Sequence, residues 1–380
     1  MSELDSDLSL SVKGAGYCLR LISGEAGGPA AAALRAGLSV LSVVYGAGLA
    51  MFLLPYKLGI RKRKRLDRPV ISIGNITFGG TGKTPTVRTI AAKLLARGAR
   101  PVILSRGYGG SLGGRTAIVS DGSSRMLSAE ECGDEPAMLA DLLPGVPVVI
   151  GKNRRKSGRL AIDKFDPDVI LLDDGLQYWQ MHRDMDIVLI NAVEPFGYGR
   201  LMPRGMLREP VAGLRRAAAV LITNSDRVAP ERLSELKDRV AGIAPSATLV
   251  ECRARPGDLR GLDGRKLGTD WLRGRRVCAF CSIGSPALFA ETLTGLGADV
   301  ALEFGYPDHH RWKPEEIQRI AAAAVDAGAE AIVTTEKDAV KLPRGKTPVP
   351  VVVSDVTIEF EPRSFVDAAL DTVGKVEAKR

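Results

Sequence analysis

Short apolar runs recur along the chain and alternate with segments whose apolar residues have helical spacing. Each run is short, and several end in a polar residue or a glycine, which predicts buried strands of a sheet. This alternation is typical of an α/β fold with a doubly wound, mostly parallel sheet that binds ligands at the carboxyl ends of its strands. The predicted strands of this first unit are residues 69–73, 101–104, 146–150, 169–172, 187–190 and 218–223.

A second α/β pattern follows, and two β-rich segments, residues 247–254 and 349–358, flank it. Their symmetric placement predicts that they pair as a two-stranded connector between two domains. The strands expected in the second unit are residues 277–281, 299–303 and 331–334, with helices around residues 285–296 and 314–327. We therefore expect a core domain at 61–246, a linker of 247–267 with 347–362, and a smaller α/β domain at 268–346.

Residues 36–56 form a stretch of 21 residues without a charge. As a helix it would be about 30 Å long, which is roughly the hydrocarbon thickness of a membrane. The basic run Arg61–Arg65 follows closely and favours a cytoplasmic location for the rest of the chain. We predict a membrane-associating helix at residues 36–60 and poor order in residues 1–35. Whether the helix spans the bilayer or lies in its interface stays open, and a buried core helix is the rival interpretation.

The composition describes a globular protein of 380 residues, with 45% hydrophobic and 26% charged residues and a net charge of +9. Basic residues cluster at 61–65 and again at 152–159, and no nucleic-acid motif accompanies them. Anionic membrane and phosphorylated ligands are therefore the favoured partners. The five cysteines form no disulfide framework, and Cys278 and Cys281 lie in an apolar run that favours buried thiols in a reducing cytoplasm.

Residues 74–84 connect a predicted strand to an amphipathic helix and end in Gly-Lys-Thr. This context predicts a phosphate-binding loop, in which backbone N–H groups and the start of the helix surround an anion. Lys83 would reach the β- and γ-phosphates, and the Thr84 hydroxyl would bind Mg²⁺. Thr77 occupies the position of the usual first glycine, so the loop is a variant of the motif. The remaining loop candidates are Gly79, Gly80, Thr81 and Gly82.

Asp173 and Asp174 directly follow the apolar run 169–172. An acidic residue at this strand end completes the magnesium shell in P-loop enzymes. Two adjacent buried carboxylates also repel each other unless a cation lies nearby. The alternative is an exposed turn.

Three further segments carry candidate chemistry, each with a plainer alternative. Asp134 begins a helical pattern, where it is either a helix cap or a carboxylate that accepts a hydroxyl proton. His309 and His310 follow Asp308, which either orients an imidazole or forms a solvated turn; a zinc site is a weak alternative. Arg154 follows a strand and would bind phosphate or simply face solvent.

Taken together, these segments resemble the tetraacyldisaccharide 4′-kinases, the lipid A 4′-kinases of Gram-negative bacteria. The matching pieces are ordered as in that family and are Tyr45–Ala47, Gly74–Pro85, Ser105–Gly109, Gly133–Pro136, Asp173–Gln177, Leu207–Pro210, Asp308–His310 and Thr335–Asp338. This chain departs from the family at Tyr178, where histidine is frequent, at Tyr306, where phenylalanine is common, and in its long N-terminus.

The resemblance implies transfer of the ATP γ-phosphate to the 4′-hydroxyl of a tetraacylated disaccharide 1-phosphate at the cytoplasmic face of the inner membrane. It implies a P-loop core, a C-terminal α/β domain on a two-stranded linker, and Mg²⁺ as a second cofactor. It assigns catalysis to Asp134 with a histidine, for which we take His309 while His310 stays open, and to Lys83 and Arg208. The metal region would contain Thr84, Asp173, Asp174 and Glu135, and the nucleotide region Tyr108, Arg154 and Gln177.

Two other classes of protein share some of these features. A membrane-attached P-loop GTPase or ATPase switch would carry the loop, but the guanine-specific Asn-Lys-x-Asp pattern is missing; the nearest string, residues 223–226, lacks the lysine. A kinase of a soluble small molecule would leave the uncharged stretch at residues 36–56 unexplained. Acyl-chain preference and oligomeric state do not follow from the sequence.

Overall fold

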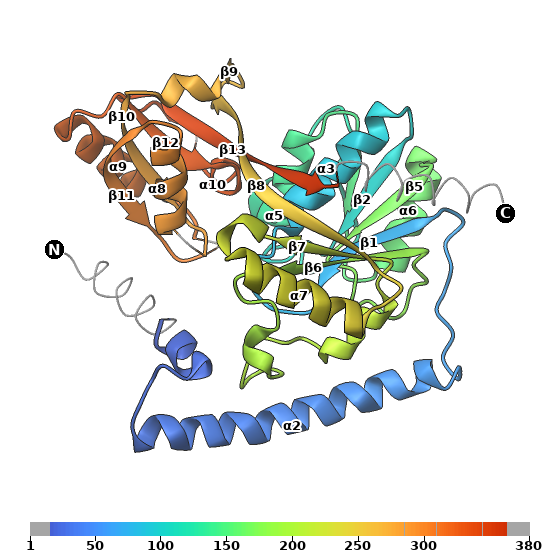
Figure 1. Ribbon diagram of the computed structural model, residues 1–380. Coiled ribbons are helices and arrows are strands. Elements are labelled where there is room, and N and C mark those ends of the chain that lie inside the picture. Colours follow the sequence, from blue (N-terminus) through green and yellow to red (C-terminus); the bar gives the residue numbers. More distant parts are fainter. Residues whose placement is uncertain (1–15, 285, 309, 344, 363–380) are drawn as a thin grey trace.

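The computed structural model describes residues 16–284, 286–308, 310–343 and 345–362 (Figure 1). Its helices are α2 (Pro29–Lys57), α3 (Lys83–Ala96), α4 (Ala129–Cys132), α5 (Asp134–Leu142), α6 (Arg154–Phe165), α7 (Pro230–Ile243), α8 (Pro286–Gly295), α9 (Pro314–Asp326) and α10 (Glu336–Ala339). Its strands are β1 (Val70–Asn75), β2 (Pro101–Ser105), β3 (Ala117–Ser120), β4 (Val148–Ile150), β5 (Val169–Asp173), β6 (Met185–Asn191), β7 (Ala219–Thr223), β8 (Thr248–Gly261), β9 (Lys266–Leu267), β10 (Arg276–Cys281), β11 (Asp299–Gly305), β12 (Ala331–Thr335) and β13 (Val351–Glu361).

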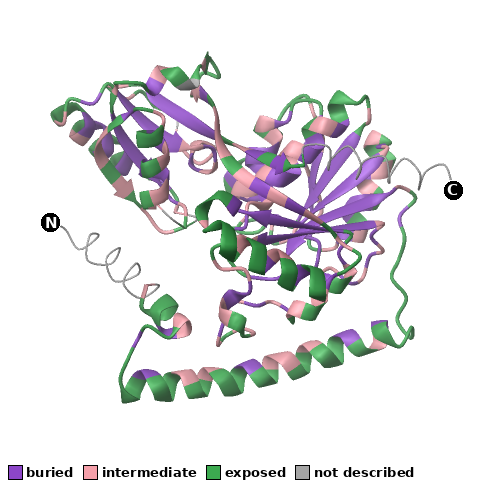
Figure 2. Cartoon of the chain, viewed as in Figure 1, coloured by how far each residue is buried: buried purple, intermediate pink, exposed green. Residues whose placement is uncertain are grey.

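The first unit is built on parallel strands in the order β7-β6-β1-β5-β2-β4, with β3 antiparallel at the edge. Every residue of β1, β2 and β5 is buried (Figure 2). Strands covered on both faces need apolar side chains throughout, which is why they appear as continuous apolar runs in the sequence. The expected doubly wound α/β fold is confirmed, and the carboxyl ends of β1, β2 and β5 meet at one edge.

Strands β11, β10, β12 and β13 run parallel and form the second unit, with separate hydrophobic clusters on its two faces. β8 pairs with β7 near its start and with β13 in antiparallel register from Glu251 to Gly261, so one continuous sheet joins both units (Figure 1). We keep the division into a core domain, a two-stranded linker and a C-terminal domain as a proposal, and these separate clusters support it.

Three boundaries differ from the sequence expectations. α2 begins at Pro29, and residues 16–23 are also helical, so residues 16–35 are more ordered than expected. Proline suits the first helical position and the alanines that follow are strong helix formers. β3 was not among the expected strands, because a four-residue edge strand has too few positions for a clear pattern. β4 begins one residue after Pro147, which has no N–H group to donate.

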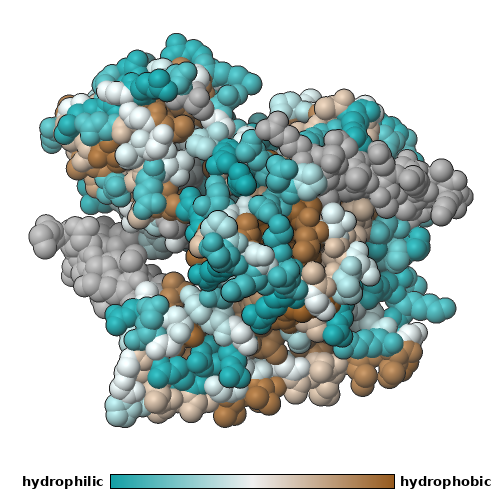
Figure 3. All heavy atoms as spheres, in the orientation of Figure 1, coloured by the Kyte–Doolittle hydropathy of each residue, from teal (hydrophilic) through white to brown (hydrophobic). Residues whose placement is uncertain are grey.

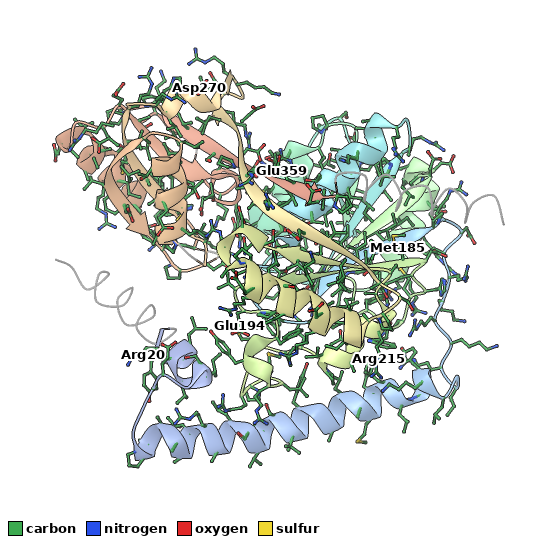
Figure 4. All side chains as sticks on the ribbon, in the orientation of Figure 1. Arg20, Met185, Glu194, Arg215, Asp270 and Glu359 are labelled. Carbon is green, nitrogen blue, oxygen red and sulfur yellow. The ribbon has the colours of Figure 1, made fainter. Side chains whose placement is uncertain are left out.

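Helix α2 lies alongside the core (Figure 1), and most of its surface is exposed, with a few buried residues along one side (Figure 2). The Tyr45 hydroxyl donates to the Arg208 carbonyl at 2.7 Å, and Ser42 Oγ bonds the Leu201 carbonyl. Near its end, Tyr56 packs on Trp179 with ring centroids 6.2 Å apart. Glu194 and Arg215, which belong to the segment between β6 and β7, lie on the α2 side of the core (Figure 4).

The outer face of α2 is apolar and forms a brown band along one side of the molecule (Figure 3). By its length and composition, this helix is the candidate for a membrane-crossing segment among the described residues, and only 11% of its most apolar window is buried. A core helix is therefore excluded. The exposed residues of this face are Leu34, Val40, Leu41, Val43, Val44, Met51, Phe52 and Leu54.

Arg88 of α3 joins the two units through a buried charge cluster. Its guanidinium lies 2.9 Å from Glu336 of α10 and also binds both carboxylate oxygens of Asp355 in β13. Burial raises the pKa of Glu336, and its hydrogen bond to Asp355 adds to this shift, so the two carboxyl groups share one arginine with a single negative charge near neutral pH. The helix that follows the glycine-rich loop is thus tied directly to the C-terminal unit.

We predict that Arg88→Met destabilises the chain by about 3 kcal/mol, because it leaves two buried carboxyl groups without their cation. The midpoint of urea unfolding measures this. Arg100→Met is the matched control, since Arg100 pairs with Asp166 and Asp168 on the exposed surface, where solvent screens the ion pairs and their loss should cost much less. Equal losses in both variants would contradict the proposed role of the Arg88 cluster.

Candidate active site

The glycine-rich loop runs from the end of β1 to the start of α3. Gly79 and Gly82 have φ angles of 105° and 79°, which glycine adopts without strain. Asn75 Nδ2 donates to Thr81 Oγ1 at 2.9 Å and holds the loop against the strand end. The loop therefore brings backbone N–H groups to the N-terminus of a helix, which is a favourable site for an anion.

Thr77, at the position of the usual first glycine, is buried and pairs as a β-bridge with Leu207. The neighbouring Phe78 N donates to the Met206 carbonyl, and Arg208 N donates to the Ile76 carbonyl, both at 2.8 Å. An extended backbone suits threonine better than glycine. The substitution thus belongs to a pairing between the glycine-rich loop and the segment that carries Arg208.

Lys83, Asp174 and Arg208 converge at the carboxyl edge of the sheet. Arg208 Nη1 lies 2.8 Å from both carboxylate oxygens of Asp174, and Lys83 Nζ lies 3.8 Å from Asp174 Oδ1. Burial alone would raise the pKa of Asp174, but the positive charges of Lys83 and Arg208 outweigh it and lower the pKa. One charge cluster thus forms from three segments: the glycine-rich loop, the end of β5 and the segment around residue 208.

Asp173 is the last residue of β5 and is almost completely buried. Ser105 Oγ donates to its Oδ2 at 3.1 Å, whereas Oδ1 has no hydrogen-bond partner among the described residues. Burial, together with the negative charges of Glu135 and Asp174, raises the pKa of Asp173 to about 7. Asp174 follows with a φ of 50°, a conformation that costs energy outside glycine. A carboxylate oxygen that lacks a donor and faces other carboxylates is a candidate ligand for a cation.

Gln177 links the site to a network that the sequence analysis did not identify. Its Nε2 donates to the Asn75 carbonyl at 2.9 Å and to Glu209 Oε1 at 2.7 Å. Arg216 also donates to Glu209 Oε1, at 2.6 Å, and to the Leu176 carbonyl at 3.3 Å. Glu209 lies inside the motif Leu207–Pro210, which was the available signal, but nothing in the sequence names its partners.

Arg154 begins α6 and is buried near the same edge. Its guanidinium carbon lies 5.5 Å from the centre of the Tyr178 ring, and its Nε makes no hydrogen bond within the part of the chain that the structure describes. Burial lowers the pKa of Arg154, and the nearby Asp173 opposes this shift. Tyr178, one of the departures from the family pattern, thus lies against a predicted site residue.

Asp134 and Glu135 form the first turn of α5. Only glycine fits at position 133 before them, because a Cβ there would lie 2.3 Å from the Tyr108 carbonyl oxygen. Lys341 Nζ, from the C-terminal unit, lies 3.5 Å from Asp134 Oδ2. Tyr108 itself is 67% exposed beside this turn.

The predicted catalytic His309 lies outside the described residues. Its neighbour His310 bonds Glu316 at 3.0 Å within the C-terminal unit, and Asp308 pairs with Lys337 at 2.6 Å. Among the described residues, no group of three or more His, Cys, Asp or Glu side chains is close enough to hold a metal ion by itself. The weak zinc alternative therefore gains no support from the described residues.

The chain matches the family model described as tetraacyldisaccharide-1-P 4′-kinase over residues 34–374. Curated relatives named tetraacyldisaccharide 4′-kinase include one from Anaeromyxobacter sp. (strain K), 44% identical over 84% of each chain. Another, from Geobacter sulfurreducens, is 43% identical over 86% of this chain and 90% of the relative. A third, from Halothermothrix orenii, is 40% identical over 81% of this chain and 83% of its own.

A solved structure of similar fold is LpxK from Aquifex aeolicus, crystallised in complex with ATP. The two chains share 31% sequence identity and superpose with a TM-score of 0.73, covering 90% of this chain and 99% of the other. The resemblance in fold thus extends over both units of the sheet.

We predict that the stability of the metal-free protein falls as the pH rises from about 4 to 7, because the raised pKa of Asp173 means that the folded state holds a proton that the unfolded state releases. Asp173→Asn removes the part of this dependence that Asp173 contributes, whereas the raised pKa of Glu336 still contributes its own part, and it stabilises the metal-free protein at pH 8 by about 4 kcal/mol at most. Urea unfolding in a chelator at pH 5 and pH 8 measures the difference.

The control is Asp186→Asn, because Asp186 is a buried carboxylate that binds Arg183 at 2.6 Å and 3.0 Å. This variant should destabilise the protein at pH 8. Wild type and Asp173→Asn curves that remain parallel across the pH range would refute the account of Asp173.

Proposed function

This chain belongs to the tetraacyldisaccharide-1-P 4′-kinase family, and we propose which of its residues bind ATP, bind the metal ion and transfer the proton in the reaction. The protein is an ATP-dependent kinase of lipid A biosynthesis that phosphorylates the 4′-hydroxyl of tetraacyldisaccharide 1-phosphate. Membership of the family leaves no role for the alternative of a membrane-attached switch. The assignments of individual residues that follow are our proposal.

The observation that carries the proposal is the convergence of Lys83, Asp174 and Arg208 beside the glycine-rich loop. Asp174 offers two carboxylate oxygens to the two cations, much as a phosphate group would. We infer that ATP brings its γ-phosphate to Lys83 and Arg208, which spread their positive charge over the transferring group. The backbone that would surround the phosphates belongs to Gly79, Gly80, Thr81, Gly82, Lys83 and Thr84.

Contacts of its side chain and its backbone fix the position of Arg208 beside the proposed phosphate site. Its guanidinium carbon lies 4.4 Å from the centre of the Phe78 ring, and its backbone is bonded to both the glycine-rich loop and α2. Arg154 would add a second buried guanidinium near the phosphates. Gln177 would support the loop from below through the Asn75 carbonyl. Tyr108, exposed beside the Asp134 turn, would contact the nucleotide.

The residues present fit Mg²⁺ as the second cofactor. Asp173 Oδ1 has no hydrogen-bond donor among the described residues, and Thr84, Asp174 and Glu135 add oxygen ligands of the kind that Mg²⁺ prefers. Magnesium in such sites takes one or two protein ligands and completes its shell with water and phosphate, so a three-carboxylate cage is not required. When bound, Mg²⁺ neutralises charge on the phosphate oxygens.

Asp134 is the proposed base, together with His309. It would accept the proton of the 4′-hydroxyl while that oxygen bonds to the γ-phosphorus and the bond to the bridging oxygen of ADP breaks. Its carboxylate is 14% exposed, which leaves it partly open to an acceptor. Its neighbour Glu135 is near enough to Asp173 for their charges to interact, which supports a position for Asp134 at the same edge of the sheet.

The acceptor is an acylated lipid, so the enzyme must work at a membrane. We propose that α2 lies on the cytoplasmic surface of the inner membrane rather than across it, because its Ser42, Tyr45 and Tyr56 face is docked on the core. A basic cavity of about 320 Å³ beside its C-terminal end would attract anionic headgroups. The cavity is lined by Tyr56, Ile60, Arg61, Lys62, Lys64, Arg155 and Gln180.

We predict that Lys83→Ala lowers phosphoryl transfer by roughly 10²–10³-fold or more, because it removes one of the two cations that converge on Asp174 in the proposed phosphate site. The assay follows the γ-phosphate of labelled ATP into tetraacyldisaccharide 1-phosphate. Lys93→Ala, on the last turn of the same helix, is the control and should retain activity. Normal turnover in Lys83→Ala would overturn the assignment of the phosphate site.

We also predict that the double variant Val43→Glu with Met51→Glu loses binding to anionic vesicles, since these side chains are 72% and 74% exposed on the apolar face of α2. Vesicle flotation measures binding, and circular dichroism checks that the fold is kept. Val325→Glu provides a control on α9, where the residue is 48% exposed. If the double variant floats like wild type, α2 does not carry the membrane contact.

A further inference from the structure

A lysine of the C-terminal unit reaches across to the proposed base. Lys341 follows α10, and its ammonium group lies 3.5 Å from Asp134 Oδ2 at the start of α5. Both side chains are largely buried, with exposed fractions of 6% for Lys341 and 14% for Asp134. The contact therefore joins two units of the fold at the catalytic edge.

Lys341 is held on its own side by two further groups. Its Nζ lies 3.1 Å from Asp338 Oδ1 and donates to Ser282 Oγ at 2.9 Å. An ammonium group has three N–H donors. Ser282 and Asp338 lie within 3.1 Å of the Lys341 ammonium group, and Asp134 is its third neighbour, an ion-pair partner at 3.5 Å. Such an arrangement orients the lysine in one direction.

Asp338 anchors this arrangement and is fully buried. It accepts hydrogen bonds from Ser282 N at 2.8 Å, Trp312 Nε1 at 3.0 Å and Thr335 Oγ1 at 2.7 Å. Burial raises the pKa of Asp338, but Lys341 and these donors outweigh that effect and lower it. Asp338 is therefore ionised, and it already balances the charge of Lys341 without help from Asp134.

Asp338 already neutralises the charge of Lys341 inside the C-terminal unit. The contact between Lys341 and Asp134 is therefore not required for the stability of that unit. Only glycine fits at position 133, where a Cβ would lie 2.3 Å from the Tyr108 carbonyl oxygen, and Lys341 contacts the carboxylate of the next residue, Asp134. We propose that Lys341 is a positioning residue for phosphoryl transfer: it orients the Asp134 carboxylate and does so only when the C-terminal unit is docked on the core.

This inference rests on the proposed role of Asp134 as the base. It also explains the motif Thr335–Asp338, which does not contact the phosphate site: Thr335 and Asp338 hold Lys341 in place. Glu336 at one end of α10 binds Arg88 behind the glycine-rich loop, and Lys341 just beyond the other end binds Asp134. One short helix thus contacts the two core helices that carry the phosphate loop and the base.

The test is a double-mutant cycle with the intact enzyme, ATP and tetraacyldisaccharide 1-phosphate. Lys341→Met should lower kcat by about 10–100-fold and change KM for ATP by less than about 3-fold, because a misdirected base slows the chemical step more than nucleotide binding. Lys341→Arg should recover part of kcat. Lys237→Met, which breaks a pair with Glu251 at 2.9 Å elsewhere, is the matched control and should leave kcat unchanged.

The decisive arm repeats Lys341→Met in an Asp134→Asn background. Residues that act as a unit are not additive, so the second substitution should then cause almost no further loss. The same fold loss in both backgrounds, or full activity of Lys341→Met, would overturn the inference. If Lys341→Met does not fold, Lys341→Gln takes its place with the same expectations. Near-normal activity of Asp134→Asn alone would instead refute the proposed base, independently of Lys341.

Discussion

Two carboxylates at the end of a fully buried strand impose the constraint on which the site depends. β5 lies between β1 and β2 and ends at the almost completely buried Asp173, and the half-buried Asp174 follows directly, so solvent screens their repulsion only in part. Asp174 is balanced by Lys83 and Arg208, which come from two other segments. Asp173 has no comparable cation beside it, and burial together with the charges of Glu135 and Asp174 raises its pKa. Without a nearby cation, Asp173 keeps a proton at higher pH than usual. A bound metal ion with its phosphate would supply the missing positive charge and favour the ionised carboxylate.

The second constraint is that one site is shared by distant parts of the chain. The antiparallel pair of β8 and β13 makes a single sheet of both units, and Arg88 ties the helix behind the phosphate loop to α10. Helix α2 joins the same assembly, since its Tyr45 holds the backbone of Arg208. The membrane-facing surface, the phosphate cluster and the proposed base are therefore linked through short chains of contacts. This suits an enzyme whose acceptor stays in a membrane while its nucleotide comes from water.

Much of this could be predicted from the sequence because it is recorded in local patterns. Continuous apolar runs marked β1, β2 and β5, and the ending Gly-Lys-Thr marked the phosphate loop. The resemblance to the kinase family supplied the acceptor, which no pattern encodes. What local patterns missed depends on tertiary contact: the pairing of Thr77 with Leu207, the Glu209–Arg216 network and the reach of Lys341 to Asp134. Thr77 with Leu207, Lys341 with Asp134 and, within the Glu209 network, Gln177 with Glu209 are far apart in sequence, so spacing along the chain carries no sign of these contacts.

The central claim is that the carboxylates at the end of β5 form the metal and phosphate site. Electron paramagnetic resonance of Mn²⁺ in the presence of ATP tests it most directly, with Mn²⁺ in place of Mg²⁺. We expect wild type and Asp186→Asn, whose buried carboxylate binds Arg183 at the opposite edge, to bind Mn²⁺–ATP tightly, and Asp173→Asn to lose that binding. Equal binding by wild type and Asp173→Asn would contradict the account.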